Sequence, residues 1–298
     1  MKILRWSVLF LGLAAGVAKS ADTDCSHSHN NYILKKSFQV IGRQGITTDG
    51  EHYFVSGTTS IEKYDKNGKM LLANNTPFDQ QSELLNHFGD LSSNNGLLYL
   101  GAEFFKDGEA RNLNISIYDA NTLKFIKNIP LDTTSGQKEI SAITVDNDNQ
   151  SFWTTAWGDD ESSHYVYQYA ISDGRFIQRI KLSPTLSFIQ GISYDKGNLF
   201  ITTDDGQADK KEPDSLYRVN IKQALNQTGD NAVLQHKFTE FTDSGEIEGV
   251  NVLNDELLVL NNRGMHIEKG MPIRPYPGYK KEISEVYIYD IRNGCKIK

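Results

Sequence analysis

Oxygen-bearing side chains recur at the openings of five similar segments, and they are the residues of this chain best suited to chemistry. The openings carry Gln44, Asp90, Ser141, Gln190 and Glu248. The second apolar run in three of these segments ends at Glu103, at Asp204 and Asp205, and at Asn261. A cluster of carboxylate and amide oxygens binds calcium or magnesium better than it binds a soft metal. Without a cation, neighbouring carboxylates would repel each other unless they share protons. The pattern therefore predicts a divalent-cation site or an acid–base centre.

Roles follow from the chemistry of each side chain. We expect Asp90, Asp204 and Glu248 to hold the cation, and His87 with Glu103 to move protons in catalysis. Glu246 is expected to face away from Glu248. The predicted ligand-binding residues are Gln44, Ser141, Trp157, Gln190, Asp205 and Asn261. The alternative, left open here, is that these polar groups only bond the backbone of nearby loops.

The positioning of these residues depends on an internal repeat. The five openings lie about 45 to 58 residues apart, and each is followed by a turn and a second apolar run. A third and a fourth β-rich stretch follow in most copies, separated by turns such as Asn67-Gly68. This spacing predicts an all-β propeller of five four-stranded blades, with six blades as the alternative. Helix is expected only as short turns near 80–86 and 222–225.

The two ends of the chain predict how the ring closes. The fifth copy ends just after Gly294, before its fourth strand, whereas residues 32–41 ahead of the first copy resemble such a strand. Donating this strand to the last blade would close the ring and cover two edges. Cys25 and Cys295 flank that seam, so we expect a disulfide between them. Two unrelated thiols are the alternative.

The N-terminal residues predict where the protein acts. Lys2 and Arg5 precede an apolar run that ends at Ala18, which predicts a signal peptide over residues 1–20, a linker over 21–31 and one domain over 32–298. We therefore expect a secreted or periplasmic protein that acts as a monomer. Export makes four asparagines possible glycan acceptors: Asn74, Asn114, Asn149 and Asn226.

The charge balance limits the possible partners. The 298 residues carry 31 basic and 38 acidic side chains, a net charge of -7, without a basic block. This argues against nucleic acid or an anionic membrane as a partner, and no later segment is long and apolar enough to span a bilayer. A small molecule, a glycan or a protein bound at the loop face is expected instead.

Loop lengths point to one face of the ring. The longest connection between a second and a third strand runs over residues 263–283, and three other blades also have long connections there. Such loops commonly form recognition surfaces, and Trp157 lies in one of them, whereas Trp153 lies in a strand and is expected in the core. Serine-triad, zincin and phosphate-loop motifs are missing from the sequence.

The repeat resembles secreted β-propellers of the gluconolactonase-like and NHL type over the whole mature chain. Glu248-Gly249 resembles the Glu-Gly opening where gluconolactonase-like propellers, which are six-bladed, place a metal-binding glutamate. Gln44-Gly45 is similar to the first blade of plant-type glutaminyl cyclases, which are five-bladed.

Two functions remain in view from the sequence. The first is a divalent-cation-dependent hydrolase, lactonase- or esterase-like, with calcium or magnesium in the acidic central pocket. The second is a non-catalytic propeller that binds a ligand or a protein through its long loops. The fold serves both classes, so it does not decide between them.

Overall fold

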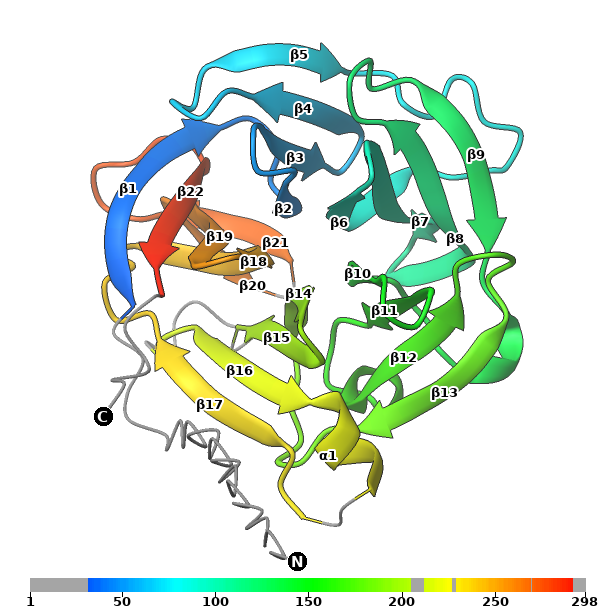
Figure 1. Cartoon of the computed structure of the whole chain (residues 1–298). Coiled ribbons are helices and arrows are strands. Elements are labelled where there is room, and N and C mark those ends of the chain that lie inside the picture. Colours follow the sequence, from blue (N-terminus) through cyan, green and yellow to red (C-terminus); the bar gives the residue numbers. More distant parts are fainter. Residues whose placement is uncertain (1–31, 205–211, 227–228, 269, 292–298) are drawn as a thin grey trace, which may run out of the picture.

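Five four-stranded antiparallel sheets form a ring in the computed structural model, which describes residues 32–204, 212–226, 229–268 and 270–291 (Figure 1). Blade one holds β2 (Gly45–Thr48), β3 (Tyr53–Gly57), β4 (Ser60–Tyr64) and β5 (Met70–Asn74). Blade two holds β6 (His87–Asn94), β7 (Leu97–Lys106), β8 (Glu109–Asp119) and β9 (Phe125–Pro130). Blade three holds β10 (Ala142–Asp146), β11 (Ser151–Thr155), β12 (Tyr165–Ala170) and β13 (Phe176–Lys181).

The last two blades complete the ring. Blade four holds β14 (Ile189–Asp195), β15 (Asn198–Thr203), β16 (Ser215–Asn220) and β17 (Ala232–Lys237). Blade five holds β18 (Ser244–Leu253), β19 (Glu256–Arg263), β22 (Ile283–Asp290) and β1 (Ile33–Val40). The chain is thus a five-bladed β-propeller, as the spacing of the repeats predicts, and the six-bladed alternative is wrong.

The first strand closes the ring, as predicted from the two ends. β1 pairs antiparallel with β22, with Phe38 opposite Val286, and the sheet order is β1-β22-β19-β18. Lys35 of β1 also forms an ion pair with Asp290 at 3.2 Å. The signal peptide, Cys25 and Cys295 lie outside the described residues, so cleavage and the disulfide stay predictions.

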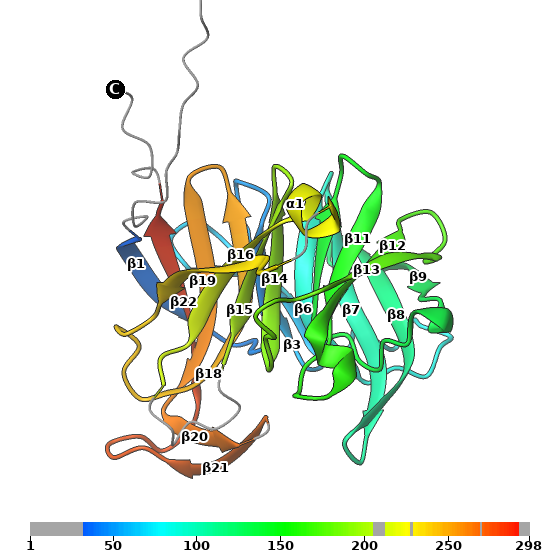
Figure 2. The same cartoon turned by 90° about the horizontal axis from the view of Figure 1, so that it is seen from below.

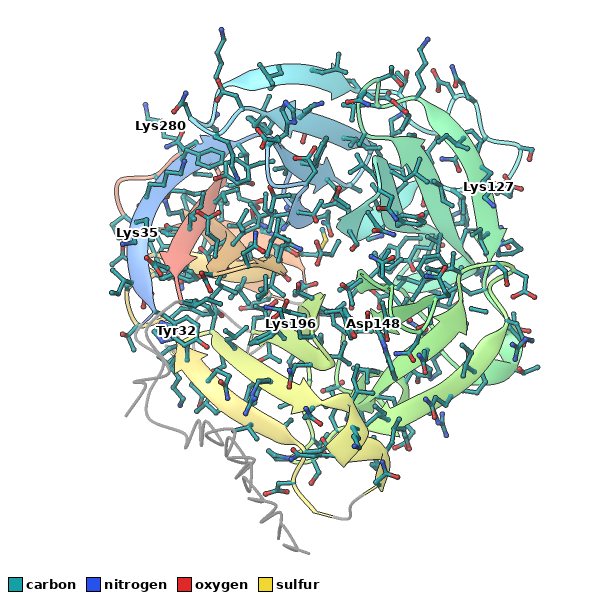
Figure 3. All side chains as sticks on the ribbon, viewed as in Figure 1. Tyr32, Lys35, Lys127, Asp148, Lys196 and Lys280 are labelled. Carbon is teal, nitrogen blue, oxygen red and sulfur yellow. The ribbon has the colours of Figure 1, made fainter. Side chains whose placement is uncertain are left out.

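Apolar side chains from neighbouring blades form the core, and side chains fill the space between the sheets (Figure 3). Trp153 is fully buried among the side chains of blades three and four, which confirms its predicted core role, and its indole N–H donates to Asp146 at 3.1 Å. In Figure 3, Lys35 and Lys127 mark the outer strands, whereas Asp148 and Lys196 mark turns that follow inner strands.

Helix is scarce in the described part of the chain. α1 (Ile221–Asn226) matches the predicted turn at 222–225, but residues 80–86 form bends without helix. Two single 3₁₀ turns, η1 (Thr133–Ser135) and η2 (Glu161–His164), connect strands of blades two and three. None of these helices is long and apolar enough to span a bilayer.

One end of the ring carries the long connections, and we call it the mouth face. The inner strands β2, β6, β10, β14 and β18 all begin there. The tip of the β7–β8 hairpin extends at this face, and so does a hairpin of β20 (Met265–Glu268) and β21 (Met271–Pro275) (Figure 2). This hairpin occupies the long 263–283 connection, which was predicted only as a loop. α1 lies at the opposite end (Figure 2).

Candidate functional site

The carboxyl group of Asp90 lies between the inner strands, fully buried. Its Oδ1 accepts the backbone N–H groups of Ile46 at 3.1 Å and Leu91 at 2.8 Å. A Cβ atom at Gly45 would lie 2.2 Å from this oxygen and one at Gly249 would lie 2.4 Å from it. The Gly residues beside the polar openings of β2 and β18 therefore make room for the Asp90 carboxyl group.

Burial controls the protonation of Asp90. It raises the pKa of this carboxyl group well above its ordinary value, although the amides of Leu91, Ile46, Ile192 and Val250 act in the opposite direction. These four amides lie in the inner strands of blades one, two, four and five, so the Asp90 carboxyl group links four inner strands of the ring. Backbone N–H groups surround this carboxyl, and its predicted role as a metal ligand has no support in this arrangement.

A second carboxyl cluster surrounds Arg43 where β2 and β18 begin. The guanidinium lies 3.2 Å from Glu246, 3.7 Å from Glu248 and 2.7 Å from Glu282. Gln190 donates to Glu246 at 2.5 Å, and Asn262 donates to Glu248 at 2.8 Å. We call Arg43, Glu246, Glu248 and Glu282 the axial cluster.

The axial cluster corrects the sequence reasoning on Glu246. Residues two apart on a strand share a face, so Glu246 and Glu248 point to the same guanidinium, and the expectation of opposite faces was wrong. Burial, followed by the nearby Glu246, raises the pKa of Glu248 well above its ordinary value despite Arg43. Burial alone would lower the pKa of Arg43, but the three glutamates raise it.

The predicted metal set is not assembled as one group. The described residues hold no group of three or more His, Cys, Asp or Glu side chains that could bind a metal ion. Arg43 supplies positive charge beside Glu248, and Asp204 is one of several negative charges that raise the pKa of Glu248. Asp205 lies outside the described residues. Calcium or magnesium binding therefore stays a prediction without a matching ligand cluster.

The two residues predicted to move protons are in contact. His87 and Glu103 face each other across β6 and β7, with Nδ1 3.1 Å from Oε1. The other carboxylate oxygen of Glu103 accepts the backbone N–H of Ile140 at 2.9 Å. Glu103 is fully buried, so His87 and the Ile140 amide fix the position of its carboxylate.

Glu139, which the sequence reasoning missed, lies directly before Ile140. Burial raises the pKa of its carboxyl group well above its ordinary value, and the negative charges of Glu103 and Asp160 raise it further. Burial alone would raise the pKa of Asp160 as well, but Lys138 at 2.8 Å lowers it. Two carboxyl groups whose pKa values are displaced in opposite directions therefore lie near each other, which is the arrangement that separates an acid from a base.

Glu139 and Asp160 line a cavity of about 1070 Å³ at the mouth face, between blades two and three. Two other residues of its wall have polar atoms with no hydrogen-bond partner among the described residues: Oδ1 of Asn114 and the indole N–H of Trp157. Asn114, a predicted glycan acceptor, is only 4% exposed, which disfavours glycan attachment there in the folded chain. The cavity wall thus combines a carboxyl group of raised pKa with an acceptor and a donor that have no hydrogen-bond partner in the described part of the chain.

The remaining residues predicted to bind a ligand are spread over several blades of the propeller. Trp157 lines the cavity, and Gln190 bonds the axial cluster. Ser141 bonds Thr155 through its hydroxyl group at 2.9 Å, and Asn261 donates to Ser244 at 2.8 Å. The backbone N–H of Gln44 donates to Ser56 at 2.8 Å. The side chains of Ser141, Gln190 and Asn261 thus bond other side chains of the propeller and not loop backbone, and ligand binding by this set stays a prediction.

Comparisons with known proteins bear on the fold. No family model matches the chain, and no curated protein matches it. Among solved structures it is similar to glutaminyl cyclase from Myxococcus xanthus, with a TM-score of 0.56 and 8% identity over 87% of this chain and 97% of that one. It also matches hydrazine synthase from Kuenenia stuttgartiensis, with a TM-score of 0.43 and 14% identity over 96% of this chain and 68% of that one. The likeness to the cyclase shows that the two proteins share the β-propeller fold.

Proposed function

We propose that the protein is a hydrolase whose active site is the cavity between blades two and three, with Glu139 as the general acid. The observation that carries this proposal is the carboxyl group of Glu139, which lines a cavity of about 1070 Å³ and has a pKa raised by burial, Glu103 and Asp160. A carboxylic acid that keeps its proton near neutral pH can protonate a leaving group. Cleavage of an ester, a lactone or a glycoside needs such a proton on the departing oxygen.

The reaction would proceed by acid-assisted hydrolysis. Glu139 gives its proton to the leaving oxygen as the C–O bond breaks, and the oxygen of a water molecule forms the new bond to carbon. The proton that this water loses restores the acid form of Glu139. The nearby negative charges favour that last step, because they raise the proton affinity of the Glu139 carboxylate. Glu103 and His87 act as positioning residues behind Glu139.

A non-catalytic binding module remains the second candidate. Trp157 and Asn114 line the same cavity, and each has a polar atom without a partner among the described residues, which a bound ligand would supply whether or not a reaction follows. Binding without turnover would favour this function.

The test compares E139Q with the wild type on a panel of ester, lactone and glycoside substrates. E139Q keeps the shape of the side chain but removes its acidic proton, so we expect kcat to fall about a hundredfold or more while ligand binding survives. The matched control is E109Q, because Glu109 lines the same cavity but pairs with Arg111 at its exposed rim at 3.0 Å. Equal turnover by E139Q and the wild type would refute the role of Glu139.

A pH profile adds an independent readout. The acid must be protonated, so activity should fall as the pH rises through the raised pKa of Glu139, and this limb should be lost in E139Q. A profile whose alkaline limb is the same in both proteins would contradict the assignment.

A further inference from the structure

We propose that the ligand of this cavity is a neutral saccharide of several units, and that the bond cleaved is glycosidic. This inference rests on the proposed function and specifies its substrate class. Two polar atoms of the cavity wall indicate the ligand class. Asn114 Oδ1 needs a donor and the Trp157 N–H needs an acceptor, and both atoms are buried without a partner among the described residues. Because a buried polar atom without a partner is costly, the ligand that suits this wall supplies both.

Hydroxyl groups meet this need, since each one donates and accepts. An ester or a lactone without hydroxyl groups offers only acceptors, so it would leave Asn114 Oδ1 unpaired. The cavity, at about 1070 Å³, is at the upper end of the range for small-molecule sites and has room for more than one sugar ring.

The charges around the cavity exclude anionic sugars. Its two cationic side chains already pair with carboxylates: Arg111 with Glu109 at 3.0 Å and Lys138 with Asp160 at 2.8 Å. Asp132 and Asp159 add further negative charge to the lining. A uronate or a sulfated sugar would be repelled here, whereas a neutral saccharide would not.

The same charges separate the possible reactions. Ester and amide hydrolysis pass through an oxyanion, and the carboxylates of Glu103 and Asp160 near Glu139 would disfavour it. Glycoside hydrolysis passes through an oxocarbenium-like state with positive charge at the sugar ring, and neighbouring carboxylates stabilise that charge. Glu139 protonates the glycosidic oxygen, the electron pair of the C–O bond goes to that oxygen, and water adds to the anomeric carbon.

The experiment is calorimetric titration of the mature chain with neutral tetrasaccharides of glucose, xylose, mannose and N-acetylglucosamine, and with tetragalacturonate and tetra-alanine. We expect at least one neutral tetrasaccharide to bind and the last two probes not to bind. W157F and N114A should each weaken binding about tenfold, the effect of losing about one hydrogen bond. The matched control is N147A, in the turn between β10 and β11 on the opposite face, which should bind as the wild type does.

The outcomes separate this inference from the proposed function. W157F keeps most of the ring and serves as the second variant if N114A lowers the melting temperature. Failure of all neutral tetrasaccharides to bind, or preferred binding of tetra-alanine or tetragalacturonate, would overturn the saccharide assignment, even if Glu139-dependent lactone cleavage upheld the hydrolase. Saccharide binding without cleavage would overturn the glycosidic reaction and leave the ligand class standing, and the hydrolase would fall with it only if esters and lactones were not cleaved either.

Discussion

Replacing Asp90 by asparagine should make the folded protein more stable at neutral pH. Burial raises the pKa of this carboxyl group well above its ordinary value, so the folded chain retains a proton that the unfolded chain releases. For a group of this kind the stability is fully present below the unfolded pKa and is lost as the pH rises toward the folded pKa. The free energy of unfolding of the wild type should therefore fall by about 1.4 kcal/mol for each pH unit in that window.

Asparagine reproduces the neutral form of the acid. It retains an oxygen for the N–H groups of Ile46 and Leu91, which lie at 3.1 and 2.8 Å from Oδ1. Because D90N has no proton to lose, its advantage over the wild type should grow by about 1.4 kcal/mol per pH unit from the unfolded pKa, about 4, up to the raised folded pKa. The control D90A leaves both amides without an acceptor and should cost about 2 to 6 kcal/mol.

Urea unfolding at pH 5, 6 and 7, followed by tryptophan fluorescence, measures these differences. Parallel pH dependence of the wild type and D90N would refute the prediction, because Asp90 would then titrate alike in the folded and unfolded chains. Equal destabilisation of D90N and D90A would also refute it, because the carboxyl group would then be needed for something other than an oxygen acceptor.

Three further predictions concern the axial cluster, the cation and the seam. R43M should lower the free energy of unfolding by about 3 kcal/mol in urea unfolding, because it leaves Glu246, Glu248 and Glu282 without their cation, whereas E248Q should change it little. If calcium or magnesium binds the acidic residues, either ion should raise the melting temperature and EDTA should lower it, and an unchanged melting curve would count against the cation. Peptide mapping without reductant should recover Cys25 and Cys295 as one linked pair, and two free thiols would contradict the seam disulfide.

The periodic features of the fold were predictable from the sequence. Two local properties, the alternation of apolar and polar residues and the position within the repeat, were enough to predict three features. These are the blade spacing, the strand that closes the ring and the burial of Trp153. The contact of His87 with Glu103 follows from the pairing of the first two strands of one blade. These predictions needed only the order of strands within a blade.

The site depends on contacts that no local pattern encodes. Arg43 lies just before β2, next to Gln44 in the sequence. A cationic residue beside the first of five repeat openings that carry oxygen-bearing side chains is the sequence signal that could have identified it. Glu139 lies in the connection after η1, and only the packing of blade two against blade three buries it beside Glu103. Asn114 lies in β8, and no sequence pattern marks its Oδ1 as a buried atom without a partner among the described residues.

The pairing of β1 with β22 also orders events during synthesis. Phe38 is made early, but its partner Val286 is made only when the last blade is nearly complete. Because distant segments must meet before this contact contributes any stability, the last sheet should form late in folding. Until then β1 has no partner in its sheet, and the ring stays open through most of translation. A circular permutant that begins between two complete blades would place both strands in one continuous segment, and it should fold faster.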